Sequence, residues 1–241
     1  MEIKVLKITD DFIFVTKPFG LPSTFKNDYD NSDCAVKQVV DIYPELKSVM
    51  GYREREGGLL YRLDNDTGGL LVFCRNNNIF NNYKRLQEYG KLYKKYVAVV
   101  ETRADSNYQG FVVDFSEKSL DEVFIDKSYS QFNLFDKFVN FGSNEFYRIN
   151  FKIIHSRKTK RRMEVVKSRR DSKYITYFTF SGKKNNYMFL EIYIQRGIRH
   201  QIRVHLASIG LHIVNDKLYG KSNIIDVNYM GLFCTGMYIR R

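Results

Sequence analysis

The sequence has no tryptophan and only three prolines and three cysteines among its 241 residues. The cysteines, Cys34, Cys74 and Cys234, are far apart and form no CxxC pair, which argues against a disulfide framework and a zinc knuckle. No apolar run approaches the roughly 20 residues of a membrane-spanning helix, and the amino terminus lacks the basic and apolar segments of a secretory signal. We therefore expect a cytoplasmic protein with no bound metal and no membrane partner.

Positive charge is what the sequence has in excess, with a formal net charge of +12. Residues 157–173 contain nine Lys or Arg against Glu164 and Asp171, which gives 9 − 2 = +7 in one short stretch. A cluster of this density favours a polyanionic partner and predicts salt-sensitive binding. The alternative is a basic face that only interacts with solvent.

The order of apolar and polar residues predicts strands separated by helices. Strands are expected at 12–15, 70–74, 93–100, 146–154, 174–180 and 187–195, and helices at 35–49, 78–90 and about 200–210. Gly90 and Gly210 follow the last two helices, where a C-terminal cap is expected. The pattern predicts an α+β fold with a mixed, largely antiparallel sheet and flanking helices. We expect one domain over 1–241.

The loop of residues 62–69 combines Arg62, Asp64 and Asp66 with two glycines, and three interpretations compete. A calcium loop of the EF-hand type would need an acidic twelfth residue, but that position is Arg75. The Asp-x-Asp-x-Thr pattern is similar to that of haloacid-dehalogenase-type phosphatases, which place it directly after a hydrophobic strand. Asp64 would then be the nucleophile and Asp66 the acid or base. The third interpretation is a structural Asx-turn.

Residues 195–207 (QRGIRHQIRVHLA) place three Arg and two His at the passage from a strand to a helix. On a helix, Arg199 and Arg203 share a face, as do His200 and Arg203. Helix N-termini and guanidinium groups both suit phosphate or carboxylate partners. A surface helix with a basic face is the alternative.

Together these segments strongly resemble the RluA-type family of pseudouridine synthases. Residues 61–70 (YRLDNDTGGL) are similar to the family pattern HRLDxxTSGL, residues 94–98 (KKYVA) to KxYxA, and residues 196–207 to TGRTHQIRVHLA. Residues 17–21 (KPFGL), 174–177 (YITY) and 216–220 (DKLYG) match further family elements, in family order over nearly the whole chain. The sequence departs from the family with Tyr61 for His, Gly68 for Ser, and Ile198-Arg199 for Arg-Thr.

The resemblance implies the pseudouridine synthase catalytic fold and an isomerase that needs no cofactor. It implies that Asp64 is the catalytic carboxylate, which attacks ribose C1′ or removes a ribose proton. It further implies that Arg203 keeps Asp64 ionised and that Tyr96 stacks on the target base. The target uridine must leave its stack, and the resemblance assigns Arg62 to the vacated space.

The expected partner is structured RNA, either ribosomal or transfer RNA. The residues expected to contact it are Lys158, Lys160, Arg161, Arg162, Arg199, His200 and Gln201. We expect a monomer without a preceding S4-type RNA-binding segment, and we interpret residues 103–145 as a family-variable insertion. The alternative function is a catalytically inactive RNA-binding or assembly factor on the same fold.

Overall fold

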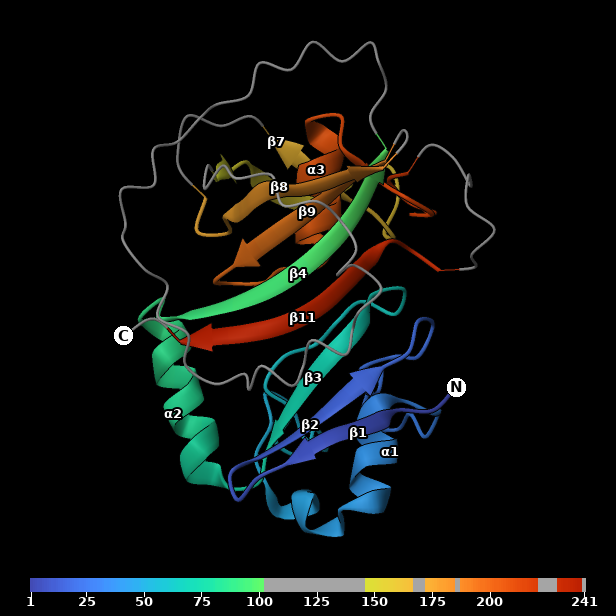
Figure 1. Ribbon diagram of the computed structural model, residues 1–241. Helices are drawn as coiled ribbons and strands as arrows, with labels where there is room; N and C mark the ends of the chain where they lie inside the picture. The colour runs from blue at the N-terminus through green and yellow to red at the C-terminus, as the bar shows by residue number, and fades with distance from the viewer. Residues whose placement is uncertain (102–145, 167–171, 185–186, 221–228, 240–241) are drawn as a thin grey trace. The chain divides into compact units, whose positions relative to one another are not determined.

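The computed structural model describes residues 1–101, 146–166, 172–184, 187–220 and 229–239. The chain divides into two compact units, Met1–Tyr89 and Gly90–Arg241 (Figure 1). The insertion expected at 103–145 lies outside the described residues, and the single-domain organisation stays a prediction. Within the described ranges, no helix is both long enough and apolar enough to cross a membrane.

Three antiparallel strands form the sheet of the amino-terminal unit. They are β1 (Lys4–Ile8), β2 (Phe12–Lys17) and β3 (Gly68–Cys74), with β2 between the other two. Every residue of β3 is buried, which accounts for its continuous run of apolar and glycine residues rather than an alternating pattern. The strands expected at 12–15 and 70–74 are confirmed.

The helices of this unit are α1 (Ala35–Ile42), the 3-10 helix η1 (Pro44–Ser48) and α2 (Asn77–Glu88). The expectation of a single helix over 35–49 is wrong. Pro44 breaks it, because proline lacks an N–H group and disfavours helical backbone at the preceding residue. The helix expected at 78–90 is confirmed as α2. The Asn76 side chain accepts a hydrogen bond from Ile79 N–H at its start (2.9 Å), and Gly90 has a left-handed φ of 65° beyond its end.

The carboxy-terminal unit contains a larger sheet in the order β11-β4-β9-β8-β5, and every pairing between these neighbours is antiparallel. Its strands are β4 (Leu92–Glu101), β5 (Tyr147–Ile149), β8 (Thr176–Lys184), β9 (Tyr187–Ile194) and β11 (Leu232–Ile239), with the short β10 (His212–Ile213) paired to β4. Ala98 of β4 lies opposite Leu190 of β9, and both are fully buried. The prediction of a largely antiparallel α+β fold is confirmed.

A separate hairpin and one helix complete this unit. Strands β6 (Lys152–His155) and β7 (Met163–Val166) pair only with each other among the described strands. The strand expected over 146–154 is therefore two strands, β5 and β6, that belong to different sheets. Helix α3 (Gln201–Ser208) contacts β7 of the hairpin and β8 and β10 of the sheet (Figure 1). Gly210, with φ 85°, follows this helix as expected.

Candidate active site

Asp64 lies in the loop that precedes β3, and its backbone takes part in a turn. The Thr67 N–H donates to Asp64 O (3.0 Å), and the Gly20 N–H donates to Asn65 O (2.8 Å). The side chain of Asp64 is partly exposed, whereas Leu63 and Thr67 on either side are buried. The loop therefore anchors itself through its apolar and backbone groups while the carboxylate stays accessible.

Lys17, the last residue of β2, holds this loop with a buried ammonium group. Its side chain is 1% exposed, and Nζ donates to the backbone carbonyls of Pro18 (3.0 Å), Leu21 (2.7 Å) and Asn65 (3.0 Å). These three bonds use every proton of the ammonium. Burial lowers the pKa of Lys17 to about 8, and the charges of Asp64 and Asp66 oppose that shift. The lysine thus combines a structural anchor with a positive charge near both carboxylates.

Ser23 fixes the residue on the other side of Asp64. The Ser23 hydroxyl donates to Leu63 O (2.8 Å), and Leu63 N–H donates back to the same oxygen of Ser23 (2.9 Å). Both bonds are buried, so neither competes with water. Because Ser23 holds Leu63 and Lys17 holds Asn65, the backbone is anchored immediately before and after Asp64.

Local contacts explain two of the departures from the family pattern. The Tyr61 hydroxyl donates to Leu70 O (2.9 Å) inside the protein, so this tyrosine anchors the start of β3. A Cβ atom at Gly68 would lie 2.8 Å from Cζ of Phe19, which is too close unless the ring moves. Gly68 and Phe19 are therefore packed against each other, and serine at 68 would require a different neighbour.

Arg62 projects from the same loop into solvent. Its side chain is 48% exposed, and Nη1 lies 4.0 Å from Oε1 of the buried Glu56. This Glu56 oxygen accepts no hydrogen bond from the described residues. At 4.0 Å this ion pair is long, and the exposed guanidinium leaves Arg62 room for contacts with a ligand.

In the carboxy-terminal unit, Tyr96 occupies the centre of β4, opposite Ile192 of β9 and Cys234 of β11. Its side chain is buried. Two residues earlier, Lys94 is also buried, and burial lowers its pKa to about 8. A Cβ atom at Gly197 would lie 2.9 Å from Lys94 Nζ. The structure thus brings residues 94–98 against the start of residues 196–207.

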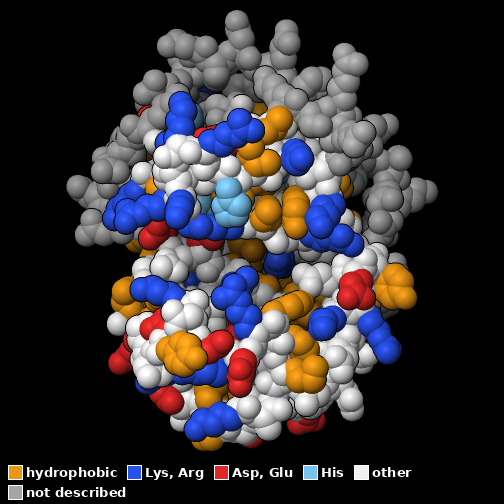
Figure 2. All heavy atoms as spheres, turned by 180° about the vertical axis from the view of Figure 1, so that it is seen from behind, with side chains coloured by type: hydrophobic (Ala, Val, Ile, Leu, Met, Phe, Trp, Pro, Cys, Tyr) orange, Lys and Arg blue, Asp and Glu red, His pale blue; other side chains and the backbone are white. Residues whose placement is uncertain are grey.

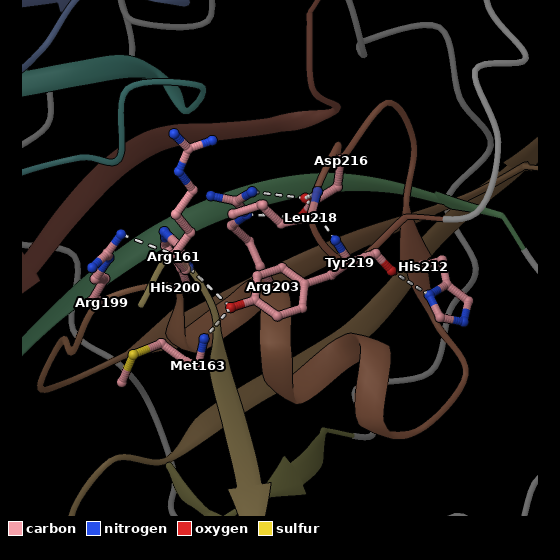
Figure 3. Close-up of polar contacts among 9 residues, drawn as sticks. All are labelled: Arg161, Met163, Arg199, His200, Arg203, His212, Asp216, Leu218 and Tyr219. Carbon is pink, nitrogen blue, oxygen red and sulfur yellow. Dashed lines mark hydrogen bonds and ion pairs between the residues drawn. The ribbon is translucent and has the colours of Figure 1, made fainter. Parts of the chain in front are cut away.

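Arg203 of α3 forms a buried bidentate ion pair with Asp216 (Figure 3). Nε and Nη2 donate to Oδ2 and Oδ1, each at 2.7 Å, and the two side chains are 2% and 0% exposed. Burial acts to raise the pKa of Asp216, but the bonds from Arg203 outweigh it and hold that pKa below its ordinary value. The guanidinium is therefore fixed in orientation. The expected pairing of Arg203 with Asp64 joins residues of different units and stays a prediction.

The polar side chains of α3 are largely committed to protein partners. Gln201 donates to Ile175 O (3.0 Å) and accepts from Ile198 N–H (3.1 Å). His205 lies between Thr176 Oγ1 (2.9 Å) and Phe151 O (3.0 Å), and burial lowers its pKa to about 4. A neutral His205 therefore anchors the helix to the sheet and to the segment between β5 and β6. The expected RNA contacts of Gln201 and His200, which is also buried, stay predictions.

The loop between β6 and β7, residues 156–162, displays the basic side chains expected from the sequence. The exposed or partly exposed ones are Arg157, Lys158, Lys160, Arg161 and Arg162. The Ser156 hydroxyl braces the loop, since it donates to Glu164 Oε1 (2.5 Å) and accepts from Lys158 N–H (3.1 Å). Arg199, in the turn before α3, adds a guanidinium whose Nη1 lies 3.5 Å from Lys160 O. Figure 2 shows Lys and Arg side chains gathered around a histidine on this unit.

Of the other basic residues of the stretch, Lys173 is exposed, whereas Lys167, Arg169 and Arg170 lie outside the described residues. Within the described ranges, no group of three or more His, Cys, Asp or Glu could hold a metal ion.

Lys17, Ser23 and Asp216 were not among the expected site residues, although two of them lie in segments that match the family. One signal marks Lys17. Ile13 and Val15 are inward-facing positions of β2 with 0% exposure, and Lys17 continues their two-residue period. A lysine at the third inward position of a buried strand indicates a special partner, because an unpaired buried ammonium is costly.

Comparison with known proteins agrees with these motifs. A family model described as RNA pseudouridylate synthase matches residues 11–208. An uncharacterized RNA pseudouridine synthase of Aquifex aeolicus is 24% identical over 96% of this chain and 61% of its own length. A second, of Chloroflexus aurantiacus, is 27% identical over 74% of this chain and 42% of its own length. The chain thus spans about half the length of these relatives.

Ribosomal large subunit pseudouridine synthase C of Buchnera aphidicola is 28% identical over 67% of this chain and 39% of its own length. Two solved structures share the fold. Human RNA Pseudouridylate Synthase Domain Containing 1 has a TM-score of 0.60 at 16% identity and covers 97% of this chain and 76% of its own. Human RNA Pseudouridylate Synthase Domain Containing 4 has a TM-score of 0.57 at 18% identity and covers 97% of this chain and 83% of its own.

The matched span includes the braced Asp64 loop, β4 with Tyr96, and α3 with the fixed guanidinium of Arg203. It covers most of the chain, and the segments occur in the order that the motifs predict. The protein therefore belongs to the RNA pseudouridylate synthase family, and its RluA-type assignment is confirmed.

Proposed function

We propose that this protein isomerises uridine to pseudouridine in RNA, with Asp64 as the catalytic carboxylate. The reaction breaks the bond between uracil N1 and ribose C1′, turns the base and joins C5 to C1′. C5 loses a proton and N1 gains one, so the product is an isomer and no co-reactant is consumed. Asp64 acts in its ionised form, either by attacking C1′ or by removing a ribose proton.

The observation that carries this proposal is the bracing of the Asp64 loop. Bonds from Ser23 and Lys17 hold Leu63 and Asn65, while the carboxylate between them stays partly exposed. A reacting group held in one geometry avoids the entropy loss of positioning it during the reaction. The positive charge of Lys17 also attracts the carboxylate, which favours a loop closed around this lysine.

By family resemblance, we assign Arg203 to stabilising ionised Asp64 and Tyr96 to stacking on the target base. Arg203 suits this role because Asp216 already fixes the orientation of its guanidinium. The target uridine has to be extruded, at a cost of a few kcal/mol. The half-exposed Arg62 is suited to fill the space that the base leaves.

We propose structured RNA as the substrate, bound through phosphate contacts of the loop 156–162 and Arg199. Such contacts set position rather than sequence. Relatives named as ribosomal large subunit synthases support ribosomal RNA, and transfer RNA is the second candidate. We propose that the protein acts as a cytoplasmic monomer without a cofactor. Pseudouridine maps of total RNA with and without the gene will identify the substrate.

Asp64→Asn is the direct test of the catalytic assignment, with Asp66→Asn as the matched control in the same loop. We expect Asp64→Asn to abolish pseudouridine formation, measured by carbodiimide treatment and primer extension, and to leave RNA binding largely intact. Asp66→Asn should keep activity, because Asp66 is exposed. In a deletion strain, wild-type protein should restore the modification and Asp64→Asn should not. Wild-type turnover by Asp64→Asn would remove Asp64 from the mechanism, and a wild-type protein without activity would favour the non-catalytic RNA-binding role.

A further inference from the structure

Tyr219 lies where the β6–β7 hairpin meets helix α3 (Figure 3). Its side chain belongs to a buried cluster with Ile153 of β6, Met163 of β7 and Val204 of α3. The Tyr219 hydroxyl accepts a hydrogen bond from the backbone N–H of Met163 at 2.7 Å. Met163 begins β7, directly after the basic loop 156–162. One phenol group therefore ties the base of this loop to the core of the unit.

The same hydroxyl also reaches the start of α3. His200 Nδ1 lies 3.0 Å from the Tyr219 oxygen. The Tyr219 oxygen accepts from Met163 N–H and either donates to Nδ1 of His200 or accepts from it, and the tautomer of His200 sets which. His200 is the N-cap residue of α3 and has a left-handed φ of 57°. A non-glycine residue keeps such a conformation only where its surroundings hold it, and Tyr219 is one of its contacts.

Tyr219 also contacts the Arg203 site in two ways, through its backbone N–H and through its ring. Its backbone N–H donates to Asp216 Oδ1 (3.0 Å), and Asp216 is the bidentate partner of Arg203. Its ring also lies close to two guanidinium groups, with Cζ of Arg203 5.4 Å and Cζ of Arg162 5.2 Å from the ring centroid. Guanidinium groups are attracted to aromatic faces at these distances. The basic loop and the fixed arginine thus contact the same ring.

We propose that Tyr219 is a positioning residue that couples RNA docking on the loop 156–162 to the orientation of Arg203. This inference rests on the proposed function. RNA phosphates bound by the loop pull on β7, and the Met163–Tyr219 hydrogen bond transmits that contact to the turn that holds Asp216. Bound RNA thereby helps to hold the Asp216–Arg203 pair in the orientation that the structure shows. Tyr219 itself does not touch the reacting atoms.

Tyr219→Phe isolates the hydroxyl, because the ring, its packing and the backbone N–H all remain. We expect the single-turnover rate at saturating RNA to fall about tenfold, while RNA affinity in filter binding changes little, because every loop charge is still present. Tyr93→Phe is the matched control, since Tyr93 is equally buried at 7% exposure and its hydroxyl accepts from Gln195 Nε2 (2.6 Å). Thermal melting should show similar losses of stability, but Tyr93→Phe should keep the wild-type rate.

A double-mutant cycle with Lys160→Ala tests the coupling itself. Lys160 lies at the surface of the loop, so this variant will fold even if Tyr219→Phe does not. In the wild-type background, Lys160→Ala should weaken RNA binding and also lower the rate at saturation. In the Tyr219→Phe background, it should weaken binding equally and leave the rate unchanged, because the link is already broken.

Three outcomes would overturn the inference: a wild-type rate in Tyr219→Phe, no effect of Lys160→Ala on the saturating rate, or rate losses that simply multiply in the double variant. Asp64→Asn in the same assays separates this inference from the proposed function. If wild-type protein forms no pseudouridine, the proposed function fails. If wild type is active, Asp64→Asn is inactive and Tyr219→Phe is unaffected, the coupling alone fails.

Discussion

Replacing Lys17 with methionine tests whether a buried ammonium holds the Asp64 loop. Methionine keeps the length and the apolar character of the side-chain stem, so the change removes mainly the charge and the three N–H donors. The carbonyls of Pro18, Leu21 and Asn65 then lose their bonds to Nζ, and the Leu21 bond is fully buried. The substitution therefore acts on the backbone next to Asp64 without touching its carboxylate.

Two effects of opposite sign determine the change in stability at neutral pH. The fall of the Lys17 pKa from 10.5 to about 8 corresponds to a cost of about 3 kcal/mol for keeping this buried group charged, at ~1.4 kcal/mol per pKa unit. Methionine avoids that cost. In the opposite direction, each buried carbonyl left without a donor lowers the free energy of unfolding by about 1–3 kcal/mol. With three carbonyls affected, this loss offsets or exceeds the avoided cost, and we expect a net decrease of up to about 6 kcal/mol in the free energy of unfolding.

The pH dependence gives a sharper test. The pKa of Lys17 is lower in the folded protein, at about 8, than the 10.5 of the unfolded chain. Between these values the unfolded chain binds a proton that the folded chain has released, so the Lys17 contribution to stability rises with pH. Lys17→Met lacks this rise. Urea unfolding between pH 7 and 10.5 should therefore show the advantage of wild type growing by about 3 kcal/mol across the window.

Lys94→Met is the matched control, because Lys94 is another buried lysine with a pKa of about 8. It should lose the same pH-dependent rise and leave the Asp64 loop in place. Only Lys17→Met should also free Asn65, and its single-turnover rate should fall more than its RNA affinity. A stability difference from wild type that stays constant from pH 7 to 10.5 would refute the reasoning about Lys17.

Two further predictions concern the RNA surface and the family departures. Replacing Lys158, Lys160 and Arg161 with alanine should reduce the slope of log affinity against log salt concentration by about 0.7–0.9 for each phosphate that the loop no longer neutralises. Filter binding at several salt concentrations measures this slope. An unchanged slope would show that the loop does not bind phosphates. Gly68→Ser should destabilise the protein by about 1–3 kcal/mol, since its Cβ would lie 2.8 Å from the Phe19 ring. Adding Phe19→Leu should recover most of the melting temperature, and a failure to recover would place the strain elsewhere.

The sequence predicted the longer strands β2, β3, β4, β8 and β9 and the two later helices well, because their apolar patterns are long and their ends carry clear signals. The Asn76 side chain caps the start of helix α2, and Gly90 adopts a left-handed backbone beyond its end, as is common at helix termini. The helix expected at 35–49 failed for the opposite reason. Its apolar period continues past Tyr43, but Pro44 interrupts the backbone, and a local steric rule overrides the pattern.

The division of residues 146–154 between two sheets could not be read from the sequence. Both strands are short and similarly patterned, so their pairing depends on partners far along the chain. Ile149 pairs with Thr176 of β8, whereas His155 pairs with Met163 of β7. Between the two strands, Phe151 O bonds to His205 of α3 at 3.0 Å. Nothing in residues 146–154 alone encodes that contact, which forms where the chain passes from one sheet to the other.

Some residues of the family motifs support the backbone, and at such positions this chain can differ from the family pattern without a change in local geometry. In residues 216–220, a Cβ atom at Gly220 would lie 2.5 Å from Asp216 O, so the tight turn requires glycine there. Asp216 caps that turn and holds Arg203. Tyr61, by contrast, needs only to anchor the start of β3, which its bond to Leu70 O achieves. A side chain that supports the backbone can be exchanged for another with a suitable donor, whereas we propose that the reaction needs the carboxylate of Asp64 itself.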